Sequence, residues 1–159
     1  MTDKAPNHGG APVGTLADLD AVTAAAVIYL RMWCDSPELR QSVRDDMIMT
    51  LGASRGRQAL NSFDELCSIR ARHGRRPMMR HAVKCKCIGA DEACFANFIA
   101  VASEGNREDA MLIATLMVRP HLAAVITSLA TDFGLALKQM RLAAPRKIAT
   151  EQPLQTTFH

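Results

Sequence analysis

The segment from His81 to Cys94 holds the densest set of metal-binding side chains in the chain. Its sequence is HAVKCKCIGADEAC, and it contains one imidazole and three of the five cysteines. Zinc in proteins prefers four ligands, chiefly thiolate sulfur and imidazole nitrogen. Cys85, Cys87, Cys94 and His81 would supply such a set, so we predict a structural zinc ion as a cofactor of this segment.

The zinc prediction requires extended backbone over residues 79–88. Within this range, residues with apolar, thiol or imidazole side chains alternate with basic ones, a period of two that is typical of extended chain. Side chains two positions apart would then bring His81, Cys85 and Cys87 to one side, and the turn that follows would return Cys94 toward them. Because no second strand is evident, we expect an isolated extended arm and no sheet.

Two other interpretations of the cysteines stay open. Neighbouring lysines and a helix N-terminus both favour thiolate, so Cys85, Cys87 or Cys94 would serve as the reactive thiol of a redox sensor. Alternatively, Cys94 is a small buried hydrophobe on the same helix face as Phe98. An enzyme would also need a base such as His81 and a group that orients it, and no such third group is evident. The sequence therefore favours a protein that is not an enzyme.

The stretch from residue 55 to residue 86 is strongly basic. It contains nine lysines and arginines against two acids, whereas the whole chain carries a formal charge of only +3. The alternative function is a nucleic-acid-binding regulator, in which this face neutralises phosphates. The arginines concerned are Arg55, Arg57, Arg70, Arg72, Arg75 and Arg76. Phe63 is the only aromatic residue in the stretch, so stacking on bases is not indicated, and a solvated basic surface explains the pattern better.

The surrounding elements are predicted to be helices. Aromatic residues make up only 4% of the chain, while alanine, leucine and nine methionines supply much of the apolar 48%. Apolar residues recur at steps of three and four through most of the sequence. We predict an all-α fold, an irregular bundle of five to six helices with a short extended arm near residues 79–88.

Local signals predict where several helices begin and end. Thr15 and Asp18 resemble a capping box that opens a first helix ending near Cys34. Ser36 followed by Pro37 is a typical start for a second helix. Gly52 would end that helix, and Gly74 would end a third in the left-handed conformation. Later helices are expected to begin at Asp91, Asn106 and beyond Pro120.

The domain organisation follows from composition. We predict a disordered N-terminal tail at 1–14, a single helical domain at 15–143 and a flexible C-terminal tail at 144–159. The sequence shows neither a signal peptide nor a transmembrane run, and its cysteines suit a reducing compartment, so we expect a cytoplasmic protein without membrane contact. The combined prediction is a small regulatory or protein-interaction domain. Its partners would be another protein or a second copy bound through the last helix.

Overall fold

The all-α prediction is confirmed by a computed structural model, which describes residues 12–143. These residues form six α-helices, two short 3-10 helices and two short strands. The α-helices are α1 (Ala21–Asp35), α2 (Pro37–Leu51), α3 (Ala53–His73), α4 (Ala90–Ser103), α5 (Arg107–Met117) and α6 (Ala123–Ala143). The strands are β1 (Pro12–Thr15) and β2 (Cys87–Gly89), and the 3-10 helices are η1 (Leu16–Asp18) and η2 (Pro120–Leu122).

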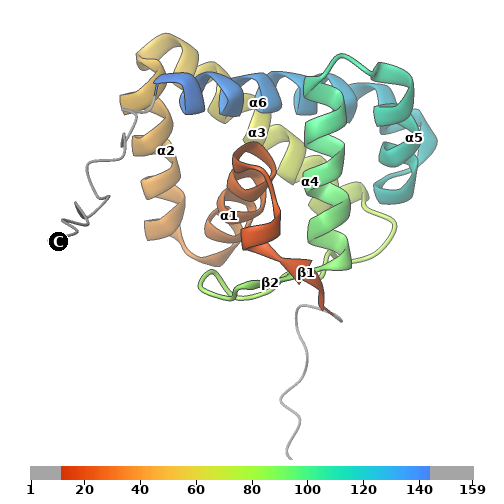
Figure 1. The fold of residues 1–159 in the computed structure, drawn as a ribbon. Coiled ribbons are helices and arrows are strands. Elements are labelled where there is room, and N and C mark those ends of the chain that lie inside the picture. The colour runs from red at the N-terminus through yellow and green to blue at the C-terminus, as the bar shows by residue number, and fades with distance from the viewer. Residues whose placement is uncertain (1–11, 144–159) are drawn as a thin grey trace, which may run out of the picture.

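Helix α6 is the helix on which the other five pack. It runs across one side of the molecule, and α1, α2 and α4 extend from it toward the end that carries the strands (Figure 1). It contacts each of the other five α-helices. Together with η2 it forms a 24-residue stretch, Pro120–Ala143, that is long and apolar enough to cross a membrane, with a mean hydropathy of 1.3 over an 18-residue window. That is weak evidence for a membrane span, because the core helix of a bundle has the same length and composition.

The first helix begins later than the sequence predicted. Thr15 does donate a hydrogen bond to the Asp18 carboxylate, at 2.7 Å, but this contact closes only the single turn η1. The N-cap of α1 is Asp20, whose Oδ1 accepts from the backbone N–H groups of Val22 and Thr23, both at 2.9 Å. The prediction of a helix starting at Thr15 was therefore wrong, because Asp20 satisfies the free N–H groups of the first turn better.

The ends of α2 agree with the sequence prediction, whereas the end of α3 does not. Ser36 Oγ accepts from the N–H of Leu39, and Gly52 follows α2 with a φ of 86°. Gly74, by contrast, has a φ of −64° and a ψ of 147°, so the predicted left-handed terminator is wrong. Extended backbone at Gly74 lets the chain pair with Val118 in an isolated β-bridge and leave α3 in a new direction.

Only the end of the predicted arm lies in a small sheet, which corrects the expectation of an unpaired segment. A turn, in which the N–H of Cys85 donates to the carbonyl of Ala82 at 2.9 Å, interrupts the extended backbone expected over residues 79–88. β2 pairs antiparallel with β1, in the register Thr15 with Cys87, Gly14 with Ile88 and Pro12 with Gly89, with an irregularity between Pro12 and Gly14. Residues 12–14 had been assigned to a disordered tail. The rest of that predicted tail, and the predicted tail at 144–159, lie outside the described residues.

The core contains most of the residues that the helical periodicity pointed inward. Phe63 of α3 stacks on Phe133 of α6 with ring centroids 4.3 Å apart, and Trp33 of α1 packs on Phe63 at 5.2 Å. Val125, also expected inside, is 45% exposed. The apolar stripe of α6, expected to pair with a second subunit, is mostly used within the chain, since Leu137 is almost completely buried.

Candidate functional site

The centre of the cysteine-rich segment is an ion pair between Arg31 of α1 and Glu92 of α4. Arg31 Nε lies 2.5 Å from Glu92 Oε2, and Nη2 lies 3.0 Å from Oε1. Neither side chain is exposed to solvent. Desolvating two charges costs several kcal/mol per ion, and such a pair persists only when its remaining hydrogen-bonding groups are also satisfied.

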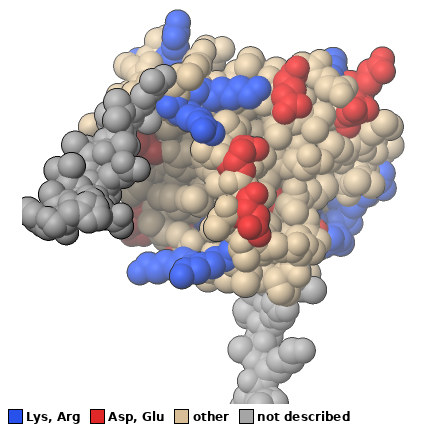
Figure 2. Space-filling view, in the orientation of Figure 1, with Lys and Arg blue, Asp and Glu red and all other residues tan. Residues whose placement is uncertain are grey.

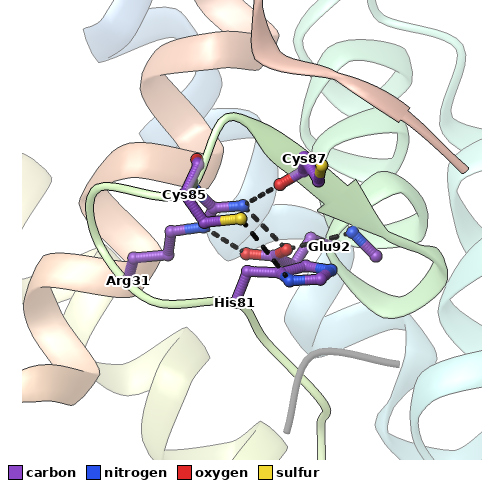
Figure 3. Close-up of polar contacts among 6 residues, drawn as sticks. Arg31, His81, Cys85, Cys87 and Glu92 are labelled. Atoms are coloured by element: carbon purple, nitrogen blue, oxygen red, sulfur yellow. Dashed lines mark hydrogen bonds and ion pairs between the residues drawn. The ribbon is translucent and has the colours of Figure 1, made fainter. Parts of the chain in front are cut away.

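The ion pair holds the backbone of the arm, defined here as residues 79–89. Arg31 Nη1 donates to the carbonyl oxygen of Cys85 and Nη2 to that of Cys87, both at 2.6 Å. Glu92 Oε1 accepts from the N–H of Gly89 at 3.1 Å. Figure 3 shows these contacts converging on the guanidinium and the carboxylate. The side chains of the pair thus fix three backbone groups at the end of the arm.

The beginning of the arm is held by the neighbouring acid. Asp91 Oδ2 accepts from the N–H of Met79 at 2.7 Å, and its carboxylate binds Arg76 at 2.9 and 2.5 Å. Partial burial alone would raise the pKa of Asp91, but the hydrogen bonds from Arg76 and Met79 lower it below its ordinary value. Consecutive acids in the first turn of α4 therefore bind the two ends of the arm.

The four predicted zinc ligands are not gathered at one point. Cys85 Sγ lies 3.8 Å from His81 Nδ1, so these two side chains are neighbours. The thiol of Cys87 is turned away from them (Figure 3), and Cys94 lies within α4, where its electrostatic neighbours are Asp91 and Arg70. Residues 12–143 contain no group of three or more His, Cys, Asp or Glu side chains that could hold a metal ion. Coordination of zinc by all four stays a prediction, which elemental analysis of untagged protein tests.

Three of the five thiols are kept in the neutral form by their surroundings. Burial raises the pKa of Cys34, of Cys67 and of Cys94, and for Cys94 the nearby Asp91 carboxylate raises it further. A redox sensor needs an accessible thiolate. Of the three cysteines considered for that role, Cys94 is thus in an environment that opposes it.

Cys85 and His81 have one of the two contacts that an activated nucleophile requires. A cysteine nucleophile is paired with a base, and the base is oriented by a third group. The distance of 3.8 Å between Cys85 Sγ and His81 Nδ1 is compatible with the first contact. The other ring nitrogen, His81 Nε2, is buried and has no hydrogen-bond partner among the described residues. The orienting contact is therefore missing from the described part of the chain.

The six arginines of the predicted nucleic-acid face are divided between the two ends of α3. Arg55 and Arg57 lie in its first turns, and the other four lie at or beyond its last turn. At a rise of 1.5 Å per residue, the two groups are separated by roughly 20 Å of helix. Figure 2 shows one face of the molecule, on which basic side chains lie in separate groups and acidic side chains lie between some of them. These six arginines thus form two basic groups in place of one continuous surface.

Several of these arginines are also engaged by acceptors of the protein itself. Arg70 Nη1 donates to the carbonyl of Arg76 at 2.9 Å, and Arg75 Nε donates to that of Thr115 at 2.6 Å. Arg76 binds the carboxylate of Asp91. These contacts fasten the chain after α3 to its neighbours, so part of the positive charge has a structural use.

Arg31 and Glu92 were not among the predicted site residues, although the sequence around each indicates a buried or capping role. Arg31 is the only charged residue of α1 before Asp35, and it is flanked by Leu30 and Met32 within an apolar helix. Glu92 is the third residue of α4, the position at which a glutamate binds the N-cap backbone. A lone charge in an apolar helix predicts a buried partner, but the sequence does not say which acid supplies it.

Comparisons of the chain with protein-family models, with curated proteins and with solved structures found no match.

Proposed function

We propose that the protein is a non-enzymatic interaction domain that presents its arm, residues 79–89, to an acidic segment of a partner protein. The observation that carries this proposal is the buried Arg31–Glu92 pair, which holds the carbonyls of Cys85 and Cys87 and the N–H of Gly89. Recognition residues commonly lie on loops that a rigid scaffold positions. A fully desolvated ion pair that positions an otherwise irregular surface segment suits that use.

The charge of the arm suggests an acidic partner. Lys84 and Lys86 are exposed and stand on either side of Cys85, whose carbonyl oxygen Arg31 holds. The two ion pairs found within residues 12–143 involve neither lysine. Two free ammonium groups on a fixed backbone favour association with carboxylates, and a surface of this kind contributes mainly to specificity and to the rate of association.

Phosphate chemistry is the rival explanation for the same charges. A nucleic-acid surface normally tracks the backbone with several cations along one path. The separation of Arg55 and Arg57 from the arginines at the other end of α3 does not favour such a path. A protein partner of limited extent, contacted by the arm alone, fits the arrangement better.

Binding to a fluorescent poly-glutamate peptide tests the proposal, with duplex DNA of equal charge measured alongside. The double variant K84E/K86E reverses both arm charges, and R55E/R57E makes the same change in net charge at the far end of α3. We expect K84E/K86E to weaken peptide binding roughly tenfold, which corresponds to about 1.4 kcal/mol shared between two contacts. R55E/R57E should leave it almost unchanged.

Three outcomes would overturn the proposal. The first is an absence of peptide binding at low salt. The second is equal weakening by both double variants, which would mean that only net charge matters. The third is tighter binding to DNA with a steep dependence on salt, which would favour the nucleic-acid alternative.

A further inference from the structure

A second feature, separate from the arm lysines, is a cavity of about 260 Å³ beside the beginning of the arm. Its walls come from α1, α3 and α4 and from the chain that follows α3. An apolar cavity of about 150 Å³ is large enough to hold benzene. This cavity therefore has room for a six-membered ring or a short alkyl chain together with a small polar group.

Most of the cavity wall is apolar. Leu30, Met78 and Phe95 contribute hydrocarbon and thioether surface, and Cys34 and Cys67 contribute thiols. Because burial raises the pKa of both thiols, they are neutral near pH 7 and behave as small hydrophobic groups. The wall suits the apolar body of a ligand.

Two guanidinium groups supply the polar part of the wall. Arg80 donates through Nη2 to the carbonyl of Cys34 at 3.0 Å, which holds the side chain of Arg80 against the end of α1. Arg70 uses Nη1 for the carbonyl of Arg76, but its Nε is buried and has no hydrogen-bond partner among the described residues. Asp and Glu side chains are absent from the residues that line the cavity. A carboxylate in the cavity would therefore meet two guanidinium groups and no competing carboxylate among the lining residues.

The chain after α3 is shaped to leave Arg70 in this place. A β-carbon at Gly74 would lie 2.0 Å from Arg70 Nη1 and 2.5 Å from the carbonyl oxygen of Arg70. Only glycine at position 74 leaves room for the guanidinium of Arg70 to pass this close to the backbone. The position of Arg70 is therefore built into the local backbone and is not one conformation of a free surface side chain.

From these observations we infer that the cavity is a binding site for a small amphipathic carboxylate, whose apolar body packs between Leu30 and Phe95 and whose carboxylate binds Arg70 and Arg80. A carboxylate matches the planar donor geometry of guanidinium groups and forms stronger hydrogen bonds with them than a neutral acceptor does. The assignment of this site does not depend on the partner proposed for the arm.

Calorimetric titration with benzoate and hexanoate at fixed ionic strength tests the inference, with benzyl alcohol and benzylamine as neutral and cationic probes. We expect benzoate to bind with a Kd of about 1 mM or tighter, a value ordinary for a ligand of this size. It should bind about tenfold more tightly than benzyl alcohol, because the alcohol leaves the guanidinium charge unpaired. Benzylamine should not bind.

Variants locate the binding. R80M and R70M should each weaken benzoate binding about tenfold. R72M is the matched control, since it removes one exposed arginine from the last turn of the same helix and should have no effect. A second measurement uses the unaltered protein, so it does not depend on whether a variant folds. Saturating benzoate should slow alkylation of Cys34 and Cys67, whereas Cys87, which does not line the cavity, should react at an unchanged rate.

The inference is wrong if benzoate and hexanoate fail to bind at about 10 mM, ten times the expected Kd. Equal affinity for benzyl alcohol would show that the guanidiniums play no part. Equal weakening in R72M would reduce the effect to net charge. Unchanged alkylation of Cys34 and Cys67 at saturation would place the benzoate elsewhere on the molecule.

Discussion

The arm is held at its two ends by the same kind of interaction in two different environments. Asp91 and Glu92 are consecutive residues of α4, and each binds one arginine and one backbone N–H. The Glu92–Arg31 pair is completely buried, whereas the side chain of Arg76 in the other pair is 60% exposed. Both carboxylates also lie at a helix N-terminus, where the helix dipole favours negative charge.

The difference between the two pairs lies in what happens when one is broken. Water can solvate Arg76 if Asp91 is lost, so the exposed pair is replaceable. Water does not reach Arg31, so the loss of Glu92 leaves a buried charge without compensation. The contacts at the end of the arm should therefore be insensitive to salt and pH until the protein unfolds. The contacts at its beginning should weaken at high salt and at low pH.

The largest effect is expected when Glu92 is neutralised. We expect E92Q to destabilise the protein by about 3–5 kcal/mol, because Arg31 then remains buried without its counter-charge. Urea unfolding followed by circular dichroism measures the change. A loss below about 1 kcal/mol would mean that water or another acid reaches Arg31.

The double variant R31M/E92L separates the charge from the packing. It replaces both charges by apolar side chains of similar size, so we expect it to be more stable than E92Q or R31M alone. The carbonyls of Cys85 and Cys87 still lose their donor, and unfolding should therefore remain easier than in the unaltered protein. If the loss of stability in R31M/E92L equals the sum of the losses in R31M and in E92L, the two residues are not coupled.

A smaller effect is expected from G74A, which tests whether the beginning of the arm is placed by steric fit. The added β-carbon would lie 2.5 Å from the carbonyl oxygen of Arg70, a backbone atom that cannot move aside cheaply. We expect a loss of about 1–3 kcal/mol in the free energy of unfolding, as for other overpacked sites. G14A is the matched control, because a β-carbon at Gly14 meets nothing within 4 Å. Similar losses in both variants would remove the steric explanation.

The smallest effect is expected from D91N, and it should depend on pH. Because the pKa of Asp91 is lowered from 3.8 in the folded state, its ionised form adds stability above that value. This contribution is lost as the pH falls through the lower folded-state pKa. D91N should therefore be less stable than the unaltered protein at pH 7, and the difference should vanish near pH 2 and shrink in high salt. Thermal unfolding at pH 7 and pH 2, with and without added salt, measures both trends, and a difference that persists at pH 2 would contradict them.

The fold was predictable because helix formation is signalled locally. The step of three to four between apolar residues placed Leu60, Phe63 and Leu66 on the buried side of α3, where the structure has them. Ser36 and Gly52 marked helix boundaries through contacts within a few residues. The strand β1 was not predictable in this way, because its partner lies more than 70 residues away along the chain.

The site was harder to predict than the fold because its central contact joins distant residues. The alternation around Cys85 and Cys87 predicted extended chain, but only Cys87–Gly89 form a strand, and a turn precedes them. The groups that Arg31 holds there are backbone carbonyls, which every residue has. The thiols directed the prediction to the segment that Arg31 holds, but not to its carbonyl groups. The decisive partner, Arg31, lies 61 positions before Glu92, and only the packing of α1 against α4 brings the two together.

Arg31 also determines where β2 lies on the bundle. β1 is mostly exposed and offers no buried side that would select one alignment with β2. The carbonyls of Cys85 and Cys87 are two positions apart and therefore face the same way, toward the guanidinium. Sliding β2 by one residue would turn both oxygens away from the guanidinium and leave Glu92 as its only acceptor among these groups, so Arg31 fixes the position of β2 against α1.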